Sequence, residues 1–352
     1  MILDPDGYIR ATLPDAMPPS LAIVIDTEEE FDWNAPFSRQ ARGTRNLAEL
    51  PRLQSILDRH GAVPLYVIDH PVASDPAAIR WLCAARDRGT CEIGTHLHPW
   101  VTPPHEEPVT CANSFTCNLP DTLQLAKIVT LTEAIRAATG ERPTTFRAGR
   151  YGIGPATLQA LVAAGYATDL SVAPHSSFAD QGGPSFYHWH NRPFWADTDR
   201  RLLGLPVTTG FSGALRAAGP AVAPVLDSRA ARAAHLPGLL AHARLIERAR
   251  LTPEGTGLAE MKRLLGAMVR DGERVLTLSQ HSSTLLPGAT VYARDEPERD
   301  ALLARLDSVL EWFTGRLGGV LASVSSIDTA IREESLSQRR VPHVCQALSP
   351  VP

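Results

Sequence analysis

Short apolar runs recur along the chain, and an amphipathic segment separates most of them from the next. The runs do not alternate apolar and polar residues, which is typical of strands that are covered on both faces. Several of the segments between them carry helix signals, such as an Asp-Pro start or a Gly stop. This pattern predicts βαβ units with parallel strands, and therefore either a (β/α) barrel or a doubly wound sheet.

The two architectures differ in the segment directly after the first strand. A doubly wound dinucleotide-binding fold needs GxGxxG there, and this chain has DTEEEFD instead. This disfavours the dinucleotide-binding fold. We expect a single domain over residues 20–330, with a helical insertion at 211–262 and a tail at 331–352. The expected strands are 21–26, 63–69, 91–94, 144–148 and 274–279, and the expected helices are 48–61, 75–89, 121–140, 154–165 and 298–319.

Composition limits the function classes and the expected partners. The formal charge of −4 and the absence of a basic cluster with interleaved aromatics give no sign of nucleic-acid binding. No run of about 18 apolar residues is present, so no membrane partner is expected. The amino terminus lacks a signal-peptide pattern and the cysteines include no CxxC, which favours the cytoplasm. A homodimer is the base-rate assembly for a soluble enzyme.

Charged and imidazole side chains come after several of the expected strands. Because ligands bind at the carboxyl ends of parallel strands, these residues are candidates for one common site. They are Asp26 and Glu28 after the first strand, His96 and His98 after the third, Arg147, Arg150 and Tyr151 around the end of the fourth, Asp169 after GYAT, and His281 after the last.

The segment EIGTHLHPW places His96 and His98 two positions apart. In a strand, residues i and i+2 point to the same face, so both imidazoles would be directed at one point. One carboxylate with two histidines is a known zinc ligand set that leaves a coordination position open for water. The pattern therefore indicates a divalent metal site, with zinc as the expected ion and nickel or cobalt as alternatives.

Five segments, in order, resemble the motifs of the polysaccharide deacetylases of the NodB-homology superfamily. These are VIDTEE, EIGTHLHPW, FRAGRYG, TDLS and LTLSQHSSTLLPG. The resemblance covers roughly residues 20–330. It implies an irregular (β/α) barrel and a metal-dependent hydrolase that removes an acetyl group from an N-acetylated carbohydrate.

The resemblance also implies a role for each matching residue. Asp26 would be the general base, Arg147 would hold it ionised, and protonated His281 would be the general acid. Asp169 would support the far side of the site. Glu28, His96 and His98 would hold the metal.

Two departures from the family pattern bear on the metal ligands. The first motif usually has adjacent aspartates, whereas here the acids are Asp26 and Glu28. The second motif usually spaces its histidines four apart, but position 100 is Trp. Either His98 coordinates the metal directly, which we expect from the strand period, or only His96 binds and the metal is weak or absent.

The substrate is less constrained than the reaction. Aromatic and polar residues near the motifs are expected to contact it, namely Trp100, Arg150, Tyr151, His190 and Trp195. An intracellular carbohydrate or other small molecule is the expected substrate. The alternatives are a hydrolase of a small non-sugar amide and a catalytically silent barrel that binds carbohydrate or a partner protein.

Overall fold

The computed structural model of the chain describes residues 4–32 and 34–340. Within these residues, ten strands form one sheet and two more form an antiparallel pair. The strands of the large sheet are β1 (Ile9–Arg10), β2 (Ser20–Thr27), β3 (Leu65–Ile68), β4 (Glu92–Leu97), β5 (Thr145–Ala148), β6 (Thr168–Asp169), β7 (Phe194–Trp195), β8 (Leu203–Gly204), β11 (Val275–His281) and β12 (Val320–Leu321). The separate pair is β9 (Thr209–Ser212) and β10 (Glu247–Arg250).

All five expected strands are present, and they pair in parallel as β11-β2-β3-β4-β5. The expected helices are also present, as α1 (Leu50–Arg59), α3 (Pro76–Asp87), α4 (Asp121–Thr139), α5 (Pro155–Ala163) and α10 (Glu296–Leu317). Asp75 caps α3 by accepting hydrogen bonds from two backbone N–H groups, and Gly140 ends α4 with a φ of 80°. The signals read from the sequence therefore act as expected at these helix ends.

The sheet curls, and a segment without regular strand structure bridges its two sides. Residues 205–208 follow β8, and Thr208 and Thr277 of β11 each donate a backbone N–H to the other's hydroxyl, at 3.0 and 2.8 Å. Arg147 on β5 also reaches Ser279 on β11, although three strands lie between β5 and β11 in the sheet. The prediction of an irregular (β/α) barrel is confirmed.

Alternating residues of β2 divide the core into two parts. Leu21, Ile23 and Ile25 pack in the large outer cluster with the helices, whereas Ala22 and Val24 belong to a second cluster inside the barrel. Helix α11 (Val324–Arg340) contributes to this second cluster from the amino-terminal end of the strands, where β12 pairs with the start of β2. Asp26 continues the inward face of Ala22 and Val24 toward the opposite, carboxyl end.

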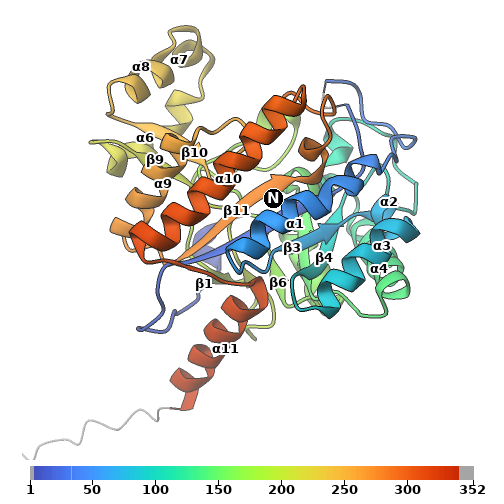
Figure 1. The fold of residues 1–352 in the computed structure, drawn as a ribbon. Coiled ribbons are helices and arrows are strands. Elements are labelled where there is room, and N and C mark those ends of the chain that lie inside the picture. Colours follow the sequence, from blue (N-terminus) through green and yellow to red (C-terminus); the bar gives the residue numbers. More distant parts are fainter. Residues whose placement is uncertain (1–3, 33, 341–352) are drawn as a thin grey trace, which may run out of the picture.

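Two expectations about chain organisation differ from the structure. The first part of the expected tail, 331–340, is helical because it continues α11, and Ile331 is buried inside the barrel. The remainder, 341–352, lies outside the described residues. The expected insertion 211–262 contains α6 (Gly219–Leu226), α7 (Arg229–Ala233) and α8 (Leu236–His242), but it also contains parts of the β9–β10 pair and the start of α9 (Leu258–Arg270). Figure 1 shows α6–α8 together at the upper left, far from α11 at the lower end.

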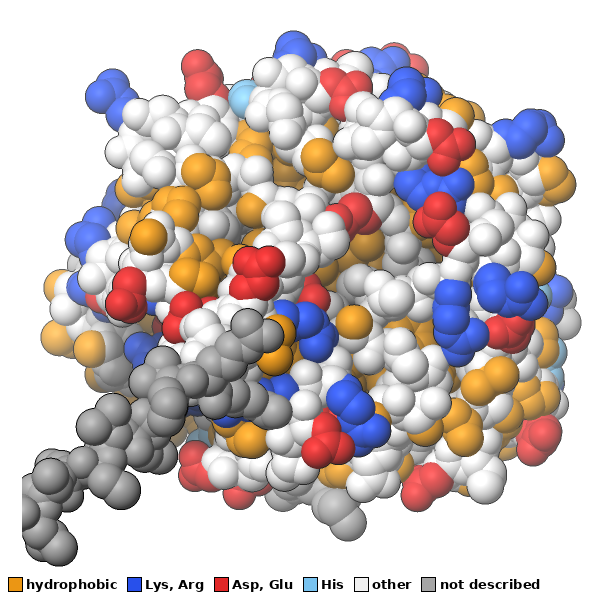
Figure 2. All heavy atoms as spheres, turned by 90° about the horizontal axis from the view of Figure 1, so that it is seen from below, with side chains coloured by type: hydrophobic (Ala, Val, Ile, Leu, Met, Phe, Trp, Pro, Cys, Tyr) orange, Lys and Arg blue, Asp and Glu red, His pale blue; other side chains and the backbone are white. Residues whose placement is uncertain are grey.

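The face seen from below, near α11, carries charges of both signs (Figure 2). In Figure 2, which views the molecule from below, basic and acidic side chains are interspersed over the face. Among the described helices, none combines the length and the apolar character that crossing a bilayer requires.

Candidate metal centre and active site

The candidate metal ligands come from the carboxyl ends of two strands. Glu28 lies just past β2, two residues after Asp26, so both acids project from the inward face. His96 lies near the end of β4 and His98 just beyond it, and their ring centroids are 4.5 Å apart. All four side chains are buried. The same-face argument made for His96 and His98 thus describes their positions correctly.

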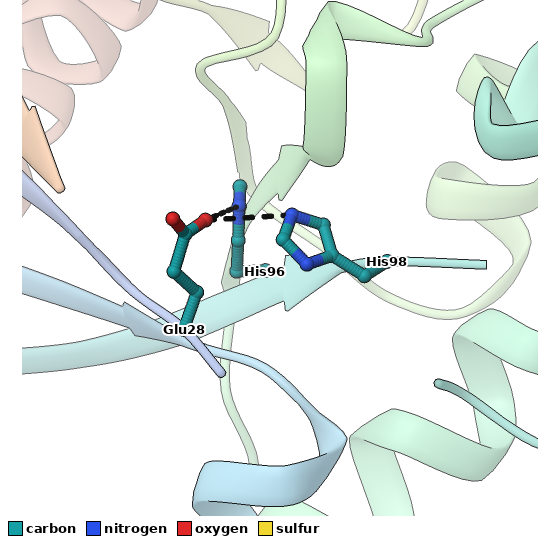
Figure 3. Close-up of side chains that lie close together, drawn as sticks. All are labelled: Glu28, His96 and His98. Carbon is teal, nitrogen blue, oxygen red and sulfur yellow. Dashed lines mark ion pairs between the residues drawn. The ribbon is translucent and has the colours of Figure 1, made fainter. Parts of the chain in front are cut away.

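Glu28, His96 and His98 present three ligand atoms to one another (Figure 3). Glu28 Oε2 lies 3.5 Å from His96 Nε2 and 3.5 Å from His98 Nε2. Zinc–ligand bonds near 2.0–2.1 Å in a tetrahedron place the ligand atoms about 3.3 Å apart. The observed distances therefore fit a small divalent cation with little rearrangement.

Side chains behind the ligands hold them in this orientation. His98 Nδ1 lies 2.8 Å from Glu29 Oε2, which leaves Nε2 directed at Glu28. Glu28 Oε1 accepts a hydrogen bond from the Ser283 hydroxyl at 3.3 Å. A carboxylate on the outer nitrogen of a histidine is the usual support of a metal-bound imidazole. The cluster therefore has the second layer of contacts that metal sites require.

Trp100 belongs to this supporting layer and does not contact the substrate pocket. Its indole Nε1 donates to Glu29 Oε1 at 2.8 Å, and its ring stacks on His98 at 4.2 Å between centroids. The indole is buried, so the prediction that Trp100 binds substrate does not fit its position. Trp100 instead helps to hold the His98 ring in place.

Burial sets the protonation states of the cluster in the absence of a cation. It lowers the pKa of His96 and of His98, so both rings are neutral, which is the form that binds metals. It also raises the pKa of Glu28 to about 7 and that of Glu29 to about 7. Several carboxyl groups confined in a buried space favour the binding of a cation, because a cation stabilises their ionised forms.

Asp26 is paired with Arg147 on β5. Arg147 Nε lies 3.1 Å from Asp26 Oδ1, and the guanidinium also donates to Ser279 Oγ and to Tyr151 Oη, both at 3.3 Å. Burial alone would lower the pKa of Arg147, but Asp26 and Tyr151 raise it above its ordinary value. The arrangement holds a charged guanidinium beside the carboxylate that the sequence nominates as the base.

His281 ends β11 beside Asp26, with His281 Nε2 3.6 Å from Asp26 Oδ2. Its other ring nitrogen, Nδ1, lies 2.7 Å from Glu254 Oε2, and its backbone N–H donates to Glu254 Oε1 at 2.8 Å. Burial alone would lower the pKa of His281, but Glu254 raises it well above the ordinary value, with Glu28 and Asp26 contributing. His281 is therefore held protonated, as a general acid must be.

Glu254 is a site residue that the sequence analysis missed. It lies in the turn after β10, in a segment expected to be helical. The stretch TPEGTG, which contains Glu254, has the Pro and Gly that are typical of a turn. That signal could have indicated a strand ending just before it, with Glu254 in the turn that follows.

Arg150 and Tyr151 line the same pocket as the cluster. Like Trp100, the candidates Asp169, His190 and Trp195 do not line it. Asp169 is buried and bonded to Ser171, whose hydroxyl accepts from the backbone N–H of Ala148, so it supports the β5 backbone from behind. Burial raises the pKa of Asp169 to about 7.

His190 and Trp195 do not line the pocket. Trp195 belongs to the inner core cluster and lies under the guanidinium of Arg332 from α11, at 5.1 Å. His190 Nδ1 accepts from the backbone N–H of Arg192. The prediction that these two side chains contact substrate does not fit their positions, because neither His190 nor Trp195 lines the pocket.

The pocket has a volume of about 630 Å³ and combines the metal cluster, the Asp26–Arg147 pair and the His281–Glu254 pair with residues of the β9–β10 region. Arg150 and Tyr151 both have left-handed backbone conformations, with φ of 54° and 58°. Each such non-glycine residue costs about 1–3 kcal/mol and is common at functional sites. Both side chains line the pocket.

Gly149 gives a direct test of how tightly the ligands are packed. A Cβ added at Gly149 would lie 2.2 Å from His98 Cδ2 and 2.8 Å from His98 Nε2. We therefore expect Gly149→Ala to displace the His98 ring and to reduce zinc affinity by at least about tenfold, measured by competition with a chelating dye. Gly315→Ala, where the added methyl meets no atom within 4 Å, should leave affinity unchanged. Equal zinc affinities of the wild type, Gly149→Ala and Gly315→Ala would show that His98 does not hold the ion.

Comparison with known proteins gives matches in structure only. No family model matches the chain, and no curated protein matches it. A protein assigned to the polysaccharide deacetylases, from Mycobacterium smegmatis, superposes with a TM-score of 0.55 at 18% identity, covering 93% of this chain and 94% of its own. Puue allantoinase gives 0.54 at 15% identity over 91% and 92%.

A second protein assigned to the polysaccharide deacetylases, from Pseudomonas aeruginosa PAO1, gives a TM-score of 0.52 at 14% identity, covering 90% of this chain and 91% of its own. These likenesses extend over nearly the whole length of both partners, so they concern the complete barrel rather than one motif. The chain therefore has the fold of the polysaccharide deacetylases, as its sequence motifs imply.

Proposed function

We propose that this protein is a metal-dependent hydrolase that cleaves the amide bond of an N-acetylated carbohydrate. One observation carries the proposal. A Glu-His-His cluster whose ligand atoms lie within 4.8 Å of one another opens into the same pocket as a base candidate and an acid candidate. That convergence argues against the alternative of a catalytically silent binding barrel, which has no need of it.

The chain's own residues supply both proton transfers of amide hydrolysis. Asp26, paired with Arg147 at 3.1 Å, takes a proton from the attacking water as the C–O bond forms. His281, kept protonated by Glu254, gives its proton to the nitrogen as the C–N bond breaks. The products are a carboxylic acid, acetic acid in the case of an acetyl group, and a free amine.

Glu28, His96 and His98 would hold the cation. When bound there, a divalent ion would polarise the amide carbonyl and lower the pKa of a water molecule toward about 7. Two imidazoles and one carboxylate suit zinc, and nickel and cobalt accept the same donors.

A small non-sugar amide is the second candidate substrate. The full-length likeness to a protein named as an allantoinase shows that this fold is shared with a protein whose name indicates a different substrate. The cytoplasmic location and the homodimer stay predictions from the sequence.

The proposal is tested by incubating the zinc-loaded protein with N-acetylglucosamine, its short oligomers and small N-acetyl amides. Acetate release is followed by an enzyme-coupled assay. Release that stops with a chelator and returns with added zinc would support the proposal. A zinc-loaded protein that releases neither acetate nor amine from any of these compounds would count against it.

The pH dependence of the reaction should depend on Glu254. A general acid works while it is protonated, so activity falls as the pH rises through the pKa of His281. Removing the carboxylate in Glu254→Gln lowers that pKa, and we expect the alkaline limb of kcat/KM to move to lower pH by about 1 unit or more. Glu106→Gln, which alters an exposed acid, is the control. An unchanged profile in Glu254→Gln would remove His281 from the role of acid.

A further inference from the structure

The carboxylates that line the pocket all have cationic or imidazole partners. Asp26 pairs with Arg147 at 3.1 Å, and Glu254 pairs with His281 at 2.7 Å. Glu28 faces the two metal-ligand histidines at 3.5 Å. The fourth, Asp227, pairs with Arg248 at 2.7 Å and with Arg232 at 3.3 Å. Three of these four carboxylates therefore have a cationic partner, and the fourth, Glu28, belongs to the metal cluster.

Two arginines of the same pocket, Arg150 and Arg250, have no such partner. Among the described residues, no carboxylate oxygen lies within 4.0 Å of either guanidinium. Arg150 is held between the rings of Phe37 and Phe115, at 5.0 and 4.1 Å, and donates to neutral oxygens of Ser114 and Gln181. The pocket therefore carries surplus positive charge away from the metal cluster.

Arg250 has donors that the described residues do not use. Its Nη1 donates to Tyr151 Oη at 2.9 Å, and its Nη2 reaches Ser176 Oγ only at 3.5 Å. Its Nε is buried and has no acceptor among the described residues. A buried donor without an acceptor is unfavourable. Arg250 also lines the pocket, where its guanidinium is open to an acceptor supplied from outside the chain.

Tyr151 connects Arg250 to the reaction centre. The same Oη that accepts from Arg250 also accepts from Arg147 at 3.3 Å, and Arg147 pairs with Asp26. The face of Tyr151 lies under the Arg250 guanidinium at 4.6 Å. Arg250 is thus linked to Asp26, the candidate base, through Tyr151 and Arg147. A small molecule bound by Arg250 therefore lies in the same pocket as Asp26.

We propose that the substrate carries an anionic group, a carboxylate or a phosphate, that binds Arg250 while its amide bond lies at the metal cluster. Arginine suits both anions because its planar donors match two oxygens at once. Arg150 adds positive charge to the same pocket. This inference rests on the proposed hydrolase function for the position of the amide, and it narrows the substrate to acidic N-acyl compounds.

The test measures binding rather than turnover, and the titrations are run in the Asp26→Asn background, which keeps zinc, so that hydrolysis of the compounds adds no heat. Zinc-loaded full-length protein is titrated calorimetrically with two matched pairs of compounds. N-acetylglucosamine 1-phosphate is compared with N-acetylglucosamine, and N-acetylglycine with N-acetylglycinamide. The first pair tests phosphate and the second tests carboxylate. Each titration is repeated with Arg250→Gln, with Arg250→Lys, and with Arg232→Gln as a matched control that removes an arginine already paired with Asp227.

The anionic member of at least one pair should bind about tenfold or more tighter than its neutral partner, as expected for hydrogen bonds to a charged group. Arg250→Gln should remove that preference, Arg250→Lys should retain part of it, and Arg232→Gln should keep most of it. No preference for the anion in either pair, including no detectable binding of either anion, would overturn the proposal. An equal loss of anionic and neutral binding in Arg250→Gln would also overturn it, because it would mark Arg250 as structural.

Failure here is distinguishable from failure of the proposed function. A protein that binds the anions through Arg250 but never holds zinc or cleaves an amide would refute the hydrolase and keep the anion site. A zinc-dependent deacetylase that binds anionic and neutral substrates equally well would refute the anion site and keep the hydrolase.

Discussion

Asp26→Asn is expected to lower kcat for amide hydrolysis by about 10²–10⁴-fold while zinc remains bound. Asparagine has almost the same shape as aspartate but does not take a proton from water. Asp26 is not one of the three clustered ligands, since Glu28, His96 and His98 supply those atoms. The measurement is kcat from acetate release alongside zinc content by mass spectrometry of the same samples.

The control for this variant is Asp32→Asn, which changes an exposed acid six residues along the same segment. Because the variant leaves Arg147 without its buried counter-charge, thermal melting must confirm that the protein is folded. Activity within a few fold of the wild type, in a folded and zinc-loaded variant, would contradict the role of Asp26 as the base.

His98→Ala is expected to abolish stoichiometric zinc binding. The change removes one of three clustered ligand atoms, and it also leaves Glu29 buried without the imidazole that it contacts at 2.8 Å. Loss of a supporting carboxylate alone, as in Glu29→Gln, typically costs about 10–100-fold in metal affinity. Loss of the ligand itself should cost more, so the two variants should rank in that order in a competition titration.

His188→Ala is the matched control, because it removes an exposed imidazole outside the pocket. If His98→Ala kept its zinc, the alternative arrangement, in which His96 acts without His98, would be favoured.

The parts of the site that could be read from the sequence are those that obey local rules. Residues two apart on a strand share a face, and parallel strands end at the same edge of a sheet. These two rules are sufficient to bring Asp26, Glu28, His96, His98 and His281 together without knowledge of side-chain packing.

The rest depended on tertiary contacts that no local pattern encodes. Nothing in the sequence distinguishes Trp100 and Trp195 from tryptophans that stack on sugars. In the structure, Trp100 supports His98 through Glu29, and Trp195 packs inside the barrel. The second half of α11, from residue 331, was expected to be a tail because most of its residues are polar, although Ile331 continues the apolar stripe of Val324 and Ile327. Glu254 reaches His281 through the β9–β10 pair, whose strands are short and lie in an alanine- and arginine-rich stretch.

The measurement that tests the central claim most directly is the zinc content of the protein purified without an affinity tag, compared with that of His96→Ala. About one zinc ion per chain in the wild type and none in the variant would show that the Glu28, His96 and His98 cluster is a metal centre. A wild-type protein that remains metal-free after incubation with zinc, nickel or cobalt would contradict the account, and the two imidazoles would then need another explanation.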